Sequence, residues 1–472
     1  TGKAVHDAGG ELVKDLTGND VVDNGKPYYG GMIFRCDMDG TNFEVLAHNF
    51  RNNYEVAVDS FGRMWQSDND DDGNKGVRIN YILEYGNYGY RDELTGAGWR
   101  AERTGMAEQI PLRHWHLNDP GVVPNLLQTG AGSPTGIAVY EGSLLPSRLH
   151  NEVIHCDAGP NIVRAYPVEK SGAGFTASID NVVEGIDKWF RPADVCVAPD
   201  GSIFITDWYD PGVGGHNMQD LERGRLFRVA PADSKYDFPK VDVTTINGAI
   251  AALRSPNLST RYLGWTALHK FGEGAESALL DLFHSGIPRE RARALWLLAK
   301  IPGKAEQYVE TAAKDSDEDI RATALRIARQ ADLDLVAIVS HLVADPSAQV
   351  RREALIALRF IDSPKADQLW AKLAALHDGK DRWYLETLGI AADLHWESRF
   401  EAWLKLTGNN WNTAAGRDIV WRSRSKKAPA MLATILLDKA TKESEQARYL
   451  RAFDYHSGPE KEQALETILL GM

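Results

Sequence analysis

The sequence predicts an incomplete β-propeller of the six-bladed type, followed by an all-α solenoid of short helices. Three observations lead to this prediction. Glycine is concentrated in the first part, where 30 of the 42 glycines precede position 241. Strand–turn–strand units that end in an acid recur in that part, and helical segments containing an Arg recur every 30 or 31 residues in the second part. We therefore expect the propeller portion to span residues 1–238 and the solenoid to span residues 239–472.

Composition limits the classes of function. Lys and Arg total 53 against 66 Asp and Glu, a formal net charge of −13, which does not suit a nucleic-acid surface. No run of about 18 apolar residues is present, so no transmembrane segment is expected in this chain. The chain begins at Thr1 without a Met or a leader, and we expect it to be an internal piece of a longer protein. Three widely spaced Cys predict single buried thiols rather than a disulfide framework.

The strand units of the first part share one pattern, an apolar strand, a Gly turn, a second strand and an acid. They are residues 55–68, 136–157 and 194–207. In the first and third units, Gly62 and Gly201 each lie six residues before the acids Asp68 and Asp207. Alternating apolar residues on both sides of such turns predict β-hairpins, and their recurrence is typical of propeller blades.

The number of visible blades is too small for a closed propeller ring. About three repeats are visible, whereas closed propellers need at least about four blades. If a further blade is present in this chain, we expect it within residues 85–115. We expect the other blades to precede Thr1 in a longer protein; the alternative is an incomplete array of sheets.

The second part repeats with a nearly constant period. The corresponding residues are Arg261, Arg291, Arg321, Arg351 and Arg382. Their spacings of 30, 30, 30 and 31 residues predict a solenoid of paired helices. Residues 317–325 resemble HEAT repeats, in which an acid caps the second helix and Ala permits close packing. The Arg ladder is interpreted as hydrogen bonding between repeats, with an anion- or partner-binding groove as the alternative. The resemblance also implies a possible protein partner on the concave face.

An acidic loop in the first part is a candidate cation site. Asp68, Asp70 and Asp72 precede Gly73, which matches the opening of a calcium-binding loop. The loop is not an EF-hand, because the residue at the closing position is Ile79. We predict that the three Asp bind calcium, since clustered carboxylates repel one another without a cation. The alternative is a solvated acidic turn.

Two arginines occupy corresponding places before predicted inner strands. Arg51 precedes the first hairpin and Arg191 precedes the third. Arginines aimed at one channel mouth suit a polycarboxylate or phosphate ligand by bidentate pairing. The alternative is that each Arg bridges adjacent blades.

The segment 112–121 offers His114 and His116, a spacing that can ligate a transition metal. No third His or Cys lies at ligand spacing, so packing within a loop is the preferred interpretation. No nucleotide-binding or hydrolase motif is present.

Residues 50–90, FRNNYEVAVDSFGRMWQSDNDDDGNKGVRINYILEYGNYGY, resemble soluble glucose/sorbosone dehydrogenases. Those proteins are six-bladed quinoproteins that use pyrroloquinoline quinone (PQQ) and calcium to oxidise sugars. Nearly all of residues 15–235 looks like the membrane-bound dehydrogenases that join such a propeller to HEAT-like repeats and a c-type haem domain with a CxxCH motif. The resemblance implies, as an expectation, that this chain is an internal fragment without the early blades and the haem domain.

The resemblance also implies roles for individual residues. Arg51 and Asn52 match the pair that contacts the quinone's carboxylates, and Arg191 matches a later Arg contact. The loop after Ser67 matches the stretch that holds the catalytic calcium. The family's general-base His lies in an earlier blade, and no His before Arg51 stands in a matching motif, so the catalytic residue is unassigned.

Two functions follow as hypotheses. The first is a fragment of a PQQ-dependent dehydrogenase that oxidises a sugar or alcohol and passes electrons to haem c on a domain outside this chain. The second is a non-catalytic, calcium-stabilised scaffold of propeller and HEAT-like repeats that binds glycans or proteins. The resemblance implies a periplasmic or cell-envelope location.

Overall fold

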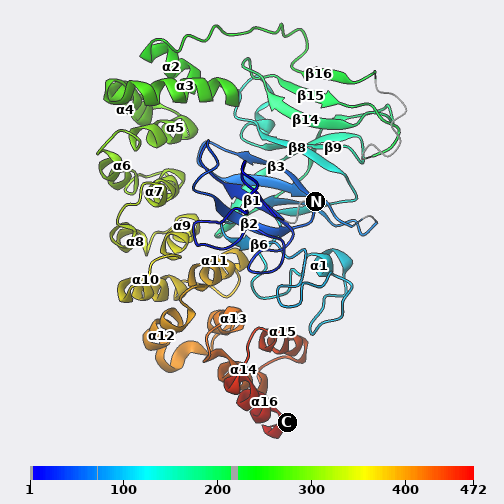
Figure 1. The fold of residues 1–472 in the computed structure, drawn as a ribbon, viewed down its shortest axis with the longest axis vertical. Coiled ribbons are helices and arrows are strands. Elements are labelled where there is room, and N and C mark those ends of the chain that lie inside the picture. Colours follow the sequence, from blue (N-terminus) through cyan, green and yellow to red (C-terminus); the bar gives the residue numbers. More distant parts are fainter. Residues whose placement is uncertain (1–3, 72, 214–221, 472) are drawn as a thin grey trace.

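The computed structural model describes residues 4–71, 73–213 and 222–471. Antiparallel strand pairs dominate the first part and helices make up the second, as the sequence predicts (Figure 1). The last strand, β16 (Arg225–Val229), and the first helix of the second part, α2 (Ile246–Leu253), flank the predicted boundary at 238/239.

In the described residues of the first part, the strands form four sheets and one two-stranded ribbon. The strands of the first two sheets are β1 (Gly31–Arg35), β2 (Glu44–Phe50) and β6 (Gly86–Asn87), then β3 (Asn53–Val58), β4 (Met64–Asp68), β5 (Val77–Tyr81) and β7 (Leu127–Gly130). Those of the other two are β8 (Pro134–Val139), β9 (Val153–Asp157), β10 (Ile162–Tyr166) and β13 (Asp180–Glu184), then β14 (Pro192–Val197), β15 (Ile203–Asp207) and β16. The ribbon pairs β11 (Val168–Ser171) with β12 (Gly174–Ala177).

The predicted hairpins are present as antiparallel pairs, β3 with β4, β8 with β9 and β14 with β15. Gly62 and Gly201 have φ of +83° and +87° at the two tight turns, a conformation that favours glycine. Strand β8 packs beside both β3 and β14, so these three strands are neighbours in space. The six-bladed ring itself remains a prediction.

The fourth sheet does not come from the expected segment. Within residues 85–115 the described elements are the short β6 and one helical turn, α1 (Ile110–His114). The additional sheet is built from β1 and β2, which lie N-terminal to the first predicted hairpin. The Cys prediction is wrong for two of the three thiols: all three are free, but Cys36 and Cys196 are exposed and only Cys156 is buried.

The second part is a succession of short helices. They are α2, α3 (Leu258–Phe271), α4 (Glu276–Ser285), α5 (Pro288–Leu298), α6 (Ala305–Ala312), α7 (Glu318–Gln330), α8 (Leu335–Leu342), α9 (Ala348–Leu358), α10 (Pro364–Ala374), α11 (Arg382–Ala392), α12 (Trp396–Thr407), α13 (Ala414–Arg422), α14 (Ala428–Leu437), α15 (Glu443–Phe453) and α16 (Pro459–Gly471). Helices α5, α7, α9, α11 and α13 pack successively in one row beside the sheets (Figure 1). Assignment of these helices to the HEAT family remains a prediction.

Arg321 and Arg351 of the Arg ladder bind within the helical part, whereas Arg382 donates to the carbonyls of Asp119 and Val122 in the first part. Arg321 donates to the carbonyls of Asp315 and Ser316 and pairs with Asp345 of the next repeat, Nε–Oδ2 2.7 Å. Arg351 donates in the same way to the carbonyls of Asp345 and Pro346. The Arg321–Asp345 contact agrees with hydrogen bonding between repeats, whereas the bonds of Arg351 fix the loop that precedes its own helix. The predicted cap is also present, because the Asp317 carboxylate accepts the amide of Asp319 at 2.9 Å.

A large hydrophobic core contains residues of both parts. Tyr81 of β5 and Phe175 of β12 pack together, with ring centroids 4.7 Å apart, and Tyr81 also contacts Trp383 of α11 at 5.8 Å. Ion pairs surround this core; Glu84 accepts both outer nitrogens of Arg329 at 2.8 Å. The sheets and the helical row are therefore joined by a packed, charged interface.

Candidate cofactor site at the rim of the sheets

Three acids occupy the same place in three sheets. They are the last residues of β4, β9 and β15, namely Asp68, Asp157 and Asp207. Each carboxylate accepts the backbone amide of the residue that immediately precedes the neighbouring strand. The pairs are Asn52 N with Asp68 at 2.8 Å, Ser133 N with Asp157 at 2.6 Å and Arg191 N with Asp207 at 2.7 Å. The loops before β3, β8 and β14 are thus fixed to one edge, which we call the rim.

The same acids also bind an Arg of the third strand in their own sheet. The pairs are Asp68 with Arg78 at 2.8 Å, Asp157 with Arg164 at 3.3 Å and Asp207 with Arg225 at 2.6 Å. Backbone amides and a guanidinium together satisfy each carboxylate. The repeated acid noted in the sequence therefore has a structural role at each rim position.

Arg51 lies on the rim with its side chain 19% exposed. Its Nε lies 2.5 Å from Oδ1 of Asp71, whose other oxygen accepts Nε1 of Trp99 at 2.9 Å. Burial raises the pKa of Asp71, but the hydrogen bond and charge of Arg51 outweigh burial, so the pKa lies below its ordinary value. The side-chain amide of Asn52 is oriented so that both its oxygen and its nitrogen are hydrogen-bonded. In this orientation its oxygen accepts a hydrogen bond from Nη1 of Arg51 at 2.9 Å.

The buried ring of His114 lies beside the cluster formed by Arg51, Asp71 and Trp99. Its Nδ1 lies 2.5 Å from Nδ2 of Asn74 and 3.9 Å from Oδ2 of Asp71. Burial lowers the pKa of His114 to about 3, so the ring is neutral at pH 7. His116 instead contacts the carbonyl of Gly89 through Nδ1 at 2.7 Å. The two histidines contact different partners, so this arrangement favours packing within the loop over joint binding of one metal ion.

Arg191 is engaged by backbone carbonyls. Its Nε donates to Asp210 O at 3.0 Å, Nη1 to Ala158 O at 2.9 Å and Nη2 to Pro211 O at 3.0 Å. The Ala158 carbonyl follows β9, whereas the other two follow β15, so Arg191 joins adjacent sheets. This geometry favours the bridging alternative and leaves none of its three nitrogens unused.

Of the three predicted calcium ligands, the structure describes Asp68 and Asp70. Asp68 is fully buried and paired with Arg78, and Oδ2 of Asp70 accepts the amide of Gly76 at 2.6 Å. Asp72 lies outside the described residues. Among the residues described, no group of three or more His, Cys, Asp or Glu is placed to hold a metal ion. Because Asp68 already neutralises Arg78, its carboxylate does not fit a calcium shell.

The two arginines predicted to bind the quinone differ in how far their donors are already engaged. Arg51 has a partly exposed guanidinium and an amide neighbour, whereas Arg191 has its donors committed to carbonyls. A quinone held by both arginines therefore does not fit the described side chains, and of the two it is Arg51 that keeps a partly exposed guanidinium. Asp71 and Trp99 were not predicted as site residues, although Asp71 lies inside the acidic loop.

One family model and a group of solved structures resemble parts of the chain. Residues 4–233 match a family model described as a domain of unknown function, DUF7133. No curated protein sequence matches the chain. In the part of the chain that the structure describes, no helix has the length and apolar character needed to cross a membrane.

The solved structures that resemble the chain do so weakly. A glucose dehydrogenase-type oxidoreductase of Thermus thermophilus is 19% identical, with a TM-score of 0.28, 39% of this chain covered and 47% of that chain. The PQQ-bound aldose sugar dehydrogenase of Streptomyces coelicolor is 18% identical, with a TM-score of 0.30, 48% of this chain covered and 61% of that chain. An engineered protein is 16% identical, with a TM-score of 0.26, 48% of this chain covered and 71% of that chain. The match thus spans about half the length of the first of these proteins.

Proposed function

We propose that the chain is part of a quinoprotein-type dehydrogenase that oxidises a sugar or alcohol and passes electrons to a haem c domain outside this chain. The support is the resemblance of residues 50–90 to sugar dehydrogenases, together with the position of Arg51. The resemblance also suggests a periplasmic or cell-envelope location.

Arg51 is the observation on which this proposal rests. Its guanidinium is partly exposed at the rim, and Asn52 lies beside it. A planar guanidinium binds carboxylates through two parallel hydrogen bonds, so Arg51 suits one carboxylate of a polycarboxylate cofactor. Asp71 holds the guanidinium in place and must share it with an incoming anion. Arg191 is assigned to the structure of the rim rather than to the cofactor.

The second candidate is a non-catalytic scaffold that binds glycans or a protein partner on the helical part. It is favoured by the engagement of Arg191 and Asp68 in contacts within the protein, since Arg191 was predicted to bind the quinone and Asp68 the calcium ion. In this case calcium is not required for the sheets to fold, because Arg78 already supplies the positive charge beside Asp68.

Thermal shift and dye reduction separate the two candidates. The chain is mixed with PQQ and CaCl₂, its melting temperature is recorded, and reduction of an artificial electron acceptor is measured with glucose, other aldoses and primary alcohols. The dehydrogenase proposal predicts a higher melting temperature with PQQ, lost in Arg51→Gln and retained in Arg148→Gln, whose side chain is 55% exposed elsewhere in the first part. An unchanged melting temperature together with no dye reduction favours the scaffold.

A further inference from the structure

A large cavity lies between the first sheet and the helical row. Its volume is about 1390 Å³, above the range of about 300–1,000 Å³ that is usual for small-molecule sites. Tyr85 and Asn87 line it from the sheets, and Arg359 and Asp393 line it from the helices. The rim residues described above do not line it, so the cavity is a separate feature of the molecule.

Charges in the cavity lining balance. The cationic residues are Arg35, Lys300, Arg329, Arg359, Arg422 and Arg424. The anionic residues are Asp15, Asp37, Glu44, Glu93, Asp332 and Asp393. His48 adds no charge at pH 7, because burial and the nearby Arg359 lower its pKa to about 4. A lining with equal numbers of both signs does not select for an anion or a cation.

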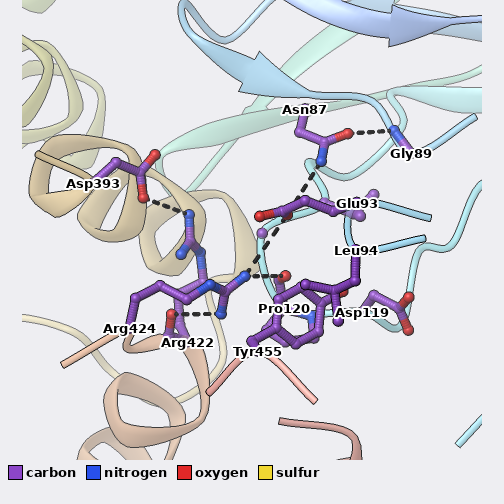
Figure 2. A network of polar contacts seen from close by, with 12 residues as sticks. Asn87, Gly89, Glu93, Leu94, Asp119, Pro120, Asp393, Arg422, Arg424 and Tyr455 are labelled. Atoms are coloured by element: carbon purple, nitrogen blue, oxygen red, sulfur yellow. Dashed lines mark hydrogen bonds and ion pairs between the residues drawn. The ribbon is translucent and has the colours of Figure 1, made fainter. Parts of the chain in front are cut away.

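One wall of the cavity is the network drawn in Figure 2. Arg424 donates to the carbonyl of Pro120 at 2.9 Å and lies 3.8 Å from the Glu93 carboxylate, which also accepts Nδ2 of Asn87 at 3.3 Å. Arg422 lies 3.4 Å from Asp393. The side chain of Glu93 is 38% exposed, so its carboxylate is accessible from the cavity while its neighbours hold it in place.

The lining also has an aromatic part. The rings of Tyr85 and Phe360 meet edge to face with centroids 5.2 Å apart. The guanidinium of Arg359 lies 5.0 Å from the Tyr85 centroid and 5.4 Å from that of Phe360. Phe360 is nevertheless 45% exposed and lines the cavity, so part of its surface is free to contact a ligand.

We propose that this cavity is a binding site for a neutral oligosaccharide, distinct from the rim. Sugar hydroxyls both donate and accept hydrogen bonds, and the cavity presents fixed carboxylate acceptors beside fixed guanidinium donors. Sugar rings also carry apolar C–H faces, which pack on exposed aromatic rings such as Phe360. The balanced charge of the lining favours a neutral sugar over a sugar acid.

Isothermal titration calorimetry of the whole chain tests the site. The affinity is measured for the neutral sugars maltotriose, cellotriose and xylotriose, and for trigalacturonate as the charged counterpart. Phe360→Ala and Glu93→Gln change one ligand-facing group each. Phe238→Ala is the matched control, because this ring is 65% exposed and does not line the cavity. Arg51→Gln reports separately on the rim.

We expect at least one neutral trisaccharide to bind. Phe360→Ala should weaken its binding about fivefold or more, because the stacking surface is lost. Glu93→Gln should weaken it about threefold to tenfold, because a charged acceptor becomes neutral. Phe238→Ala and Arg51→Gln should leave the affinity unchanged. The proposal is overturned if none of the neutral sugars binds, if trigalacturonate binds better than all of them, or if Phe360→Ala has no effect on binding.

Discussion

The carboxylate of Asp68 and the guanidinium of Arg78 form an ion pair that is wholly buried in the first part of the protein, with Oδ2 and Nη2 2.8 Å apart. The pair joins the end of β4 to β5, and Asp68 also holds the loop that carries Arg51 and Asn52. The rim geometry around Arg51 therefore depends on this buried pair.

Replacing Asp68 by Asn leaves the Arg78 charge buried without its partner. We expect Asp68→Asn to lower the free energy of unfolding by about 3–5 kcal/mol, measured by urea denaturation. Asp187→Asn removes an exposed pair with Arg225 and should leave the free energy of unfolding nearly unchanged. If Asp68→Asn were as stable as the wild type in calcium-free buffer, the pairing account would be wrong.

Glu84 and Arg329 make the interface between the two parts sensitive to acid. Burial raises the pKa of Glu84, but the charge and hydrogen bonds of Arg329 outweigh it and lower the pKa to about 2. A carboxyl whose pKa is depressed on folding stabilises the protein above its unfolded pKa, and this contribution is lost as the pH falls. The difference in melting temperature between wild type and Glu84→Gln should be fully present at pH 6 and above and should shrink as the pH falls from about 4.5 toward 2. A difference that stays constant with pH would contradict this assignment.

The tip of the β11–β12 ribbon fits closely against α11. A Cβ added at Gly174 would lie 2.1 Å from the ring of Trp383, which is held in the shared core. We expect Gly174→Ala to cost about 1–3 kcal/mol, seen as a lower melting temperature. At Gly98 an added Cβ meets no atom within 4 Å, so Gly98→Ala is the control and should be nearly neutral. Equal melting temperatures for the two variants would show that the ribbon does not pack as described.

Arg191 is expected to act on stability. Arg191→Gln removes donors from the carbonyls of Ala158 and Pro211 and should cost about 2–3 kcal/mol in urea denaturation. Exposed Arg148→Gln should change stability by about 1 kcal/mol or less. A stable Arg191→Gln variant that no longer responds to PQQ would return Arg191 to the cofactor site.

Local patterns predicted the hairpins and helix caps because they depend on residues close in sequence. Gly62 at a tight turn and Asp317 before α7 are examples. The partners of Asp68 and Arg191 were not predictable in the same way. Arg78 faces Asp68 through the register of β4 against β5, and the carbonyls around Arg191 come from loops of two different sheets.

The cavity also could not be predicted from the sequence, because its walls come from both parts of the chain. Asn87 and Arg424 lie far apart in sequence and become neighbours through the packing of the helical row on the sheets. The exposed ring of Phe360 has no local pattern that marks it as ligand-facing. Packing between distant segments, rather than local propensity, creates this site.

Titration of the chain with PQQ in the presence of calcium, followed by quenching of tryptophan fluorescence, tests the central claim most directly. Trp99 shares Asp71 with Arg51 and so lies beside the proposed contact. We predict saturable quenching that becomes at least about tenfold weaker in Arg51→Gln and is unchanged in Arg148→Gln. Absence of saturable quenching, or equal affinities for the wild type and Arg51→Gln, would contradict the assignment of Arg51 to a quinone cofactor.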